Sequence, residues 1–320
     1  MIQKQPPRLL NRRQVIKKTG SYMLAVPFAG LAACKWEDAT DELDDVTSEG
    51  VSASSGYSYE NAESLDADNS DVAWATGGTA AMTVTYPDPF DDVDLGTACT
   101  LTTVLTEGPC YSGTLEREDI SEGRNGLPVR LSFLVVDSTC TPVPGAVVDI
   151  WHCDPYGVYS GDDMSNVDFC TGGDTEAQAA AWFRGTQTTD TDGRVNFSTC
   201  YPGWYTGRAV HIHLKVLING DTYTISQVGF SDDLNLEILA NEPVYQDKGT
   251  NGYTYNNSDT VFPNSGYEVY LCDTQKMSDG SMLAWKTFVI PDEPTSDTGS
   301  GSGGMGGGGQ PPGGGGPGQP

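Results

Sequence analysis

The most informative part of the sequence is PGWYTGRAVHIHLKV, residues 202–216. It brings Tyr205, Arg208, His211 and His213 within nine positions, and the chain holds one further histidine, His152. His211 and His213 alternate with aliphatic residues, so on a β-strand both imidazoles point to one face and the aliphatic side chains to the other. Two imidazoles on one strand face make half of a metal site, although an ordinary pair of surface or core histidines fits the same alternation.

A second segment, VDIWHCDPYGVYSG at residues 148–161, has the pattern of a strand that runs into a turn. Tyr159 follows a glycine in this turn, where a side chain is free to point toward a site built by another strand. Together the two segments resemble the intradiol ring-cleavage dioxygenases, the non-haem iron enzymes that open catechols. The resemblance implies that Fe(3+) is held by Tyr159, Tyr205, His211 and His213.

The resemblance extends to two residues beside these ligands. Arg208 stands three positions before the first histidine, and Gln227 lies in the following strand-like run, TISQVGF. Both are implied to be catalytic, together with Tyr205. The chain departs from the family pattern at Gly229 and at Cys110, where aromatic residues are common.

Two upstream segments also resemble the family. LTEGPCYSG, residues 105–113, is similar to its loop at the site, and EREDISEGRNGLPVRLSFLVVD, residues 116–137, is similar to its first core strand. The similarity runs roughly from Ala98 to Pro291. Four motifs in the same order make the resemblance much more specific than any single one.

The implied chemistry follows from the ligands, because phenolate is a strongly donating oxygen ligand that suits a ferric ion. The resemblance implies that a catechol chelates the iron as a dianion and displaces Tyr205, which accepts a substrate proton. It implies that Tyr159 stays bound. Dioxygen then attacks the ring, and the product is a cis,cis-muconate-type diacid. We expect Arg208 to stabilise the developing negative charge and Gln227 to hydrogen-bond the substrate or order the pocket.

Two other interpretations are open from the sequence. The chain is also compatible with a noncatalytic, exported β-sandwich binding module, or with an enzyme whose histidines bind copper or zinc. Retention of all four ligands favours the ferric enzyme over the module. His152 has no ligand partner in the motif, so we expect it to be structural, and we expect Trp151 and Trp204 to pack beside the site. The sequence identifies neither the catechol nor the oligomeric state.

The first 33 residues carry six basic side chains and no acidic ones. The paired arginines Arg12 and Arg13 precede an apolar stretch too short to span a bilayer comfortably, which ends at LAAC, residues 31–34. These features predict a twin-arginine signal peptide over residues 1–33, with cleavage before Cys34 and lipidation of that cysteine. The predicted location is outside the cytoplasm, on a membrane, through the lipid at Cys34.

Removal of these six basic residues leaves 11 basic against 44 acidic residues, a formal charge of −33. Nucleic acid is then an unsuitable partner, because it requires a positive surface. The acidic, serine-rich composition of the next part predicts a disordered tether over residues 34–97 that contributes little to stability. The glycine- and proline-rich residues 295–320 are predicted to be a disordered tail.

Between tether and tail, residues 98–294 are predicted to form one domain. Short β-branched runs separated by Gly, Pro, Asn and Asp turns are typical of an all-β fold, here an antiparallel β-sandwich of the intradiol dioxygenase type. The run at residues 234–241 is the one convincing helix, and TDTDGRV, residues 189–195, is predicted to be a turn rather than a calcium loop.

Eight cysteines without a CxxC pair indicate disulfides rather than a zinc cluster in an exported protein. Lipidation of Cys34 would leave seven, so at least one stays free. A bridge between Cys153 and Cys170 would bracket the Tyr159 loop, and this pair is our prediction, although sequence does not give connectivity.

Overall fold

The structure is a computed structural model, and it describes residues 57–91 and 93–295. The predicted signal peptide, Cys34, the first part of the predicted tether and residues 296–320 lie outside this range. Among the described residues, no helix has the length and apolar character needed to cross a membrane.

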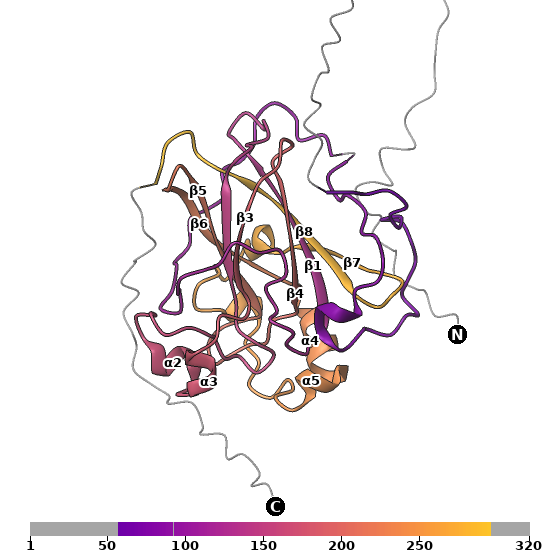
Figure 1. The fold of residues 1–320 in the computed structure, drawn as a ribbon, viewed down its shortest axis with the longest axis vertical. Coiled ribbons are helices and arrows are strands. Elements are labelled where there is room, and N and C mark those ends of the chain that lie inside the picture. The colour runs from indigo at the N-terminus through magenta and orange to yellow at the C-terminus, as the bar shows by residue number, and fades with distance from the viewer. Residues whose placement is uncertain (1–56, 92, 296–320) are drawn as a thin grey trace, which may run out of the picture. The chain divides into compact units, whose positions relative to one another are not determined.

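Two four-stranded sheets form the domain, as the sequence predicts for a β-sandwich (Figure 1). The first sheet has the order β3-β2-β5-β6, and the second has the order β4-β1-β8-β7. The strands are β1 (Pro128–Val136), β2 (Val147–Trp151), β3 (Arg184–Thr188), β4 (Arg194–Cys200), β5 (His211–Ile218), β6 (Asp221–Gly229), β7 (Asp273–Lys276) and β8 (Met282–Val289).

Side-chain alternation places the core between the two sheets. Leu131 and Phe133 of β1 and Ile212 and Leu214 of β5 are fully buried in one apolar cluster. Neighbouring residues therefore point to the outer faces, because successive side chains of a strand alternate. Within the sheets all pairs are antiparallel except β1 with β8, where the long connection between the two strands permits parallel pairing.

The helices lie in the connections. The predicted helix at 234–241 is confirmed and begins two residues earlier, where the Ser231 side chain accepts a hydrogen bond from Leu234 N as an N-cap. The helical elements are η1 (Gly78–Ala81), α2 (Val167–Thr171), α3 (Thr175–Gln178), α4 (Asp232–Asn241), α5 (Pro243–Gln246), η2 (Asn256–Ser258) and η3 (Tyr267–Tyr270).

Part of the predicted tether packs onto the domain, so the boundary that we predicted at Ala98 is wrong. Residues 57–91 run along the second sheet, on the side of β1 and β7 (Figure 1). Trp74 packs against the main core, and Phe90 is buried in a cluster with Leu134. The acidic composition of the segment concealed these aromatic anchors, each of which buries a large apolar area.

The predicted disulfide between Cys153 and Cys170 is also wrong. Cys170 pairs with Cys110, and Cys99 pairs with Cys140. Cys153 is instead buried at the end of β2, with its Sγ 3.4 Å from the carbonyl oxygen of Gly203, and burial raises the pKa of its thiol to about 12. One half of the expectation holds, since Cys170 does anchor the loop that carries Tyr159.

Candidate metal centre

The two histidines of β5 point to the outer face of the first sheet. His213 pairs with Trp151 of β2 on one side and with Gln227 of β6 on the other, so the three side chains form one row across the sheet. The indole of Trp151 stacks on the imidazole of His213, with 5.0 Å between ring centroids and an interplanar angle of 11°. The sheet therefore holds His213 between two fixed neighbours.

The two tyrosines come from turns that fit closely together. A Cβ on Gly157 would lie 2.4 Å from the carbonyl oxygen of Trp204, and one on Gly203 would lie 2.3 Å from that of Pro155. Only glycine permits both approaches, and Gly157 also has a φ of +84°. The glycines of the two motifs thus bring the Tyr159 turn onto the Tyr205 turn.

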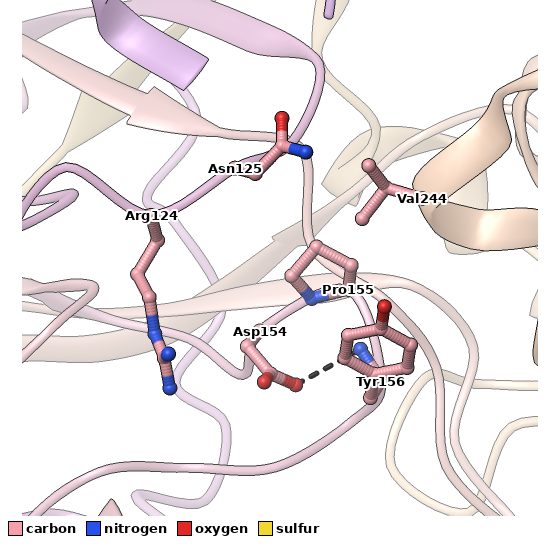
Figure 2. A pocket seen from close by; sticks show the side chains of 6 residues that line it. All are labelled: Arg124, Asn125, Asp154, Pro155, Tyr156 and Val244. Atoms are coloured by element: carbon pink, nitrogen blue, oxygen red, sulfur yellow. Dashed lines mark hydrogen bonds between the residues drawn. The ribbon is translucent and has the colours of Figure 1, made fainter. Parts of the chain in front are cut away.

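Asp154 shapes the first of these turns. Its Oδ1 accepts hydrogen bonds from the backbone N–H groups of Tyr156 and Val158, both at 2.9 Å. Figure 2 shows Asp154 and Tyr156 in a small pocket that Val244 also lines. The four predicted ligands do not line that pocket, so it is separate from the metal centre.

Four donor atoms converge at the outer face of the sheet. The Nε2 of His211 lies 3.3 Å from Tyr159 Oη, 3.2 Å from Tyr205 Oη and 3.2 Å from His213 Nε2, and the two Oη atoms are 3.5 Å apart. Donors at about 2.0–2.1 Å from one ion, at ordinary coordination angles, are separated by roughly 3.1–3.5 Å. The four predicted ligands therefore fit a single metal ion.

The protonation of these groups also suits a metal. Burial lowers the pKa of His211 to about 3 and holds the pKa of His213 well below its usual value, so both imidazoles are neutral and have a lone pair to donate. The Nδ1 of His211 lies 2.7 Å from the carbonyl oxygen of Ala209, a contact that directs Nε2 toward the other donors. Burial raises the pKa of Tyr159 well above its ordinary value, so a cation must replace its proton.

The tyrosines are essential to this donor set. Within residues 57–91 and 93–295, no group of three or more His, Cys, Asp and Glu side chains is arranged to hold a metal. Two neutral imidazoles with two phenolic oxygens make a set of hard and intermediate donors, which suits a ferric ion. It lacks the carboxylate of the two-histidine, one-carboxylate ferrous sites.

Arg208 lies beside the donors and is held from both sides. Its Nη1 is 3.4 Å from Tyr205 Oη, and its Nη2 donates to Gln227 Oε1. Its Nε donates to Asp259, whose carboxylate also accepts the backbone N–H of Ala209 at 2.6 Å. Burial would raise the pKa of Asp259, but the guanidinium and the backbone donors outweigh it and lower that pKa.

The loop that contains Cys110 covers the site. A Cβ on Gly108 would lie 3.2 Å from His213 Cε1, so this glycine lets the loop pass directly over the imidazole. Gln227 Nε2 donates to the carbonyl oxygen of Thr106 at 2.7 Å, which ties the same loop to β6. The disulfide of Cys110 with Cys170 joins the loop to α2.

The comparisons with known proteins agree with this geometry. Residues 106–248 match a family model described as "Dioxygenase". A solved intradiol ring-cleavage dioxygenase from Tetranychus urticae is 27% identical, with a TM-score of 0.54, and the match covers 62% of this chain and 98% of that one. A second solved dioxygenase is 28% identical with the same TM-score and the same shares of both chains. A comparison with curated proteins gives no match.

In both sequence and fold, the domain is thus similar to the intradiol ring-cleavage dioxygenases. The protein is therefore an oxidoreductase of the dioxygenase class. Both departures from the family pattern have a structural reason. Cys110 forms a disulfide, and a Cβ on Gly229 would lie 3.0 Å from the ring of Phe262, so this distant phenylalanine occupies the space beside position 229.

The structure also shows the roles of two residues outside the ligand set, one predicted from the sequence and one missed. His152 is structural, as predicted, since its two ring nitrogens contact Cys153 O and Thr199 Oγ1. Asp259, which fixes Arg208, could not be found in the motifs, because it lies 51 residues beyond Arg208 in a polar loop. Its one sequence signal is an aspartate just before TVF in a segment otherwise rich in Asn and Ser.

Proposed function

We propose that this intradiol dioxygenase uses ferric iron, held by Tyr159, Tyr205, His211 and His213, to cleave a catechol-type aromatic between its two hydroxylated carbons. Dioxygen is the second substrate, and the product is a cis,cis-muconate-type diacid. The observation that carries the proposal is the convergence of two phenolic oxygens and two neutral imidazole nitrogens within 3.2–3.5 Å.

When bound, the ferric ion would supply a Lewis acid that accepts a chelating catecholate and activates its ring for reaction with dioxygen. The protein supplies the proton acceptor and the fixed charge. Tyr205 Oη is the phenolic oxygen nearest to Arg208, so it would accept a proton from the incoming catechol while the guanidinium balances the resulting negative charge. Gln227 keeps Arg208 in place.

Colour and oxygen uptake test this proposal. Protein loaded with Fe(3+) should be red through tyrosinate-to-iron charge transfer, and anaerobic addition of a catechol should produce a longer-wavelength band. Oxygen should bleach that band as a ring-opened diacid forms. A panel of catechol, protocatechuate and hydroxyquinol, followed by oxygen consumption and product identification, would define the substrate. Equal activity of zinc- or copper-loaded protein would contradict the ferric site, and folded, iron-loaded protein inert toward the panel would favour a binding module.

We also propose that the enzyme is exported and anchored through a lipid on Cys34. The paired arginines and the LAAC sequence support this, and so do the two disulfides of the domain, which form and persist in oxidising compartments. Joint replacement of Arg12 and Arg13 by Lys should leave the precursor inside the cell, and Cys34→Ala should abolish lipid labelling. Normal processing and lipidation of both variants would contradict the proposal.

A further inference from the structure

A groove of about 410 Å³ lies on the outer face of the second sheet, away from the metal centre. Its floor is made by outward-facing side chains of β1 and β4, among them Arg130 and Asn196. Its wall is the upstream segment with Tyr57, Tyr59 and Tyr86. Its volume falls within the range of small-molecule sites, roughly 300–1,000 Å³.

The three tyrosine rings are held in place from the protein side. Tyr57 Oη accepts the backbone N–H of Asn196 at 3.0 Å, Tyr86 Oη lies 2.6 Å from Ser281 Oγ, and the Tyr59 hydroxyl bonds to the Asn196 side chain. All three rings are half-buried. Because their hydroxyl groups are already hydrogen-bonded, the three rings are fixed before a ligand arrives. They present apolar surfaces to it, and binding costs little additional ordering of these side chains.

The charged groups of the groove compensate each other. Arg130 forms an ion pair with Glu118, and Arg130 Nη1 also donates to Ser198 at 3.2 Å. The guanidinium carbon of Arg130 lies 5.9 Å from the centroid of Tyr57 and 6.0 Å from that of Tyr86, so the pair sits among the rings. The side chains of Arg130 and Glu118 are 15% and 49% exposed. A planar donor, the guanidinium, and a planar acceptor, the carboxylate, are therefore both accessible to a ligand in the groove.

This combination selects a class of ligand. Aromatic faces bind the apolar face of a sugar ring, and a planar donor and acceptor side by side match neighbouring hydroxyl groups. An anionic ligand is disfavoured, because Glu118 already neutralises Arg130 and the chain has a formal charge of −27. We propose that the groove is a binding site for a neutral saccharide, which would hold the enzyme on polysaccharide while the opposite face carries out the oxidation.

Calorimetric titration of the full chain tests the site. The probes are cellohexaose, xylohexaose, mannohexaose and laminarihexaose, with hexagalacturonate as the charged counterpart. At least one neutral hexasaccharide should bind saturably. Tyr59→Ala should lower the affinity for that hexasaccharide about tenfold, since a stacked aromatic ring contributes about a factor of ten to affinity. Tyr59→Phe, which keeps the ring, should bind like the natural chain. Tyr255→Ala, which removes an exposed ring outside the groove, is the matched control.

A charge variant keeps the test decisive if Tyr59→Ala fails to fold. Glu118→Gln leaves Arg130 without its counter-charge, so it should gain binding of hexagalacturonate. Glu122→Gln, which breaks the exposed ion pair with Arg117 outside the groove, should not. The proposal is overturned if none of the four neutral probes binds, if binding survives Tyr59→Ala in folded protein, or if Glu118→Gln gains nothing. Catechol competing for the same site would also overturn it.

Discussion

The two tyrosines of the metal centre occupy unequal positions. Tyr159 is 1% exposed, its backbone N–H donates to Cys170 O at 2.8 Å, and the guanidinium carbon of Arg184 lies 5.9 Å from its ring centroid. Tyr205 is less buried, and its hydroxyl lies within reach of Arg208. Tyr159 is held on all sides, which suits a permanent metal ligand. Tyr205 is more exposed, which suits a ligand that leaves when the substrate binds.

This asymmetry predicts different consequences for the two Phe variants. Tyr159→Phe should lower iron affinity by more than about 100-fold, because even the partners that orient metal ligands contribute 10–100-fold. Tyr205→Phe should retain more iron and lose turnover, since it removes the proton acceptor. Metal analysis and the visible spectrum distinguish the two. Iron content and ring cleavage that survive loss of both hydroxyl groups would show that the site is elsewhere.

Asp259 is expected to matter through Arg208. Asp259→Asn leaves a buried guanidinium without its counter-charge, which should cost about 3–5 kcal/mol of unfolding free energy at neutral pH. The pKa of Asp259 is lowered in the folded protein, so its stabilisation is present above the unfolded pKa and is lost as pH falls through the folded one. The difference in unfolding free energy between the natural chain and the variant should therefore shrink below about pH 4.

Urea denaturation at pH 7 and at acid pH measures this difference. Asp192→Asn is the matched control, because it removes a 53%-exposed carboxylate from a 3.6 Å contact with Arg194. Exposed pairs contribute less than about 1 kcal/mol. Equal losses for the two variants at pH 7 would mean that Asp259 does not compensate the charge of Arg208.

At the scale of elements, the apolar and β-branched runs predicted the sandwich, and β1, β2, β5 and β6 lie within the runs that the sequence marks as strand-like. β3, RGTQT, escaped prediction because it has no apolar run, and it is held in place by pairing with β2. The four ligands could be predicted because their motifs are local. The partner of Cys170 could not, because disulfide connectivity depends on how separate loops meet in the folded chain.

The disulfide between Cys110 and Cys170 joins the covering loop to the loop of Tyr159. Its removal by Cys110→Ser with Cys170→Ser should lower stability by about 2–4 kcal/mol. It should also speed iron loss, because Tyr159 N is hydrogen-bonded to Cys170 O. The bridge between Cys99 and Cys140 packs in another apolar cluster than Tyr159 and Tyr205, so its removal should lower stability similarly and leave iron retention unchanged. Equal iron loss from both variants would rule out a local role.

At the scale of the molecule, the two outer faces of the sandwich have different covers. Loops and α2 cover the face with the metal centre, and the upstream segment covers the face of β1 and β4. Composition predicted a disordered tether here because the segment is rich in acidic and small residues and has few large apolar ones. The few aromatic residues determine the outcome instead, since each one buries as much apolar surface as several small residues.

The upstream segment should therefore stabilise the domain. A chain of residues 57–295 should unfold like the full chain, whereas residues 98–295 should be less stable by about 3–6 kcal/mol, because Trp74 and Phe90 each contribute roughly 1.5–3 kcal/mol through burial. Thermal and urea unfolding of both shortened chains measure the difference. In a domain of this size, each kcal/mol shifts the midpoint by about 2–4 °C. A midpoint for residues 98–295 within about 2 °C of the full chain would show that the segment only rests on the sheet, and the saccharide groove would then lose its wall without cost to the fold.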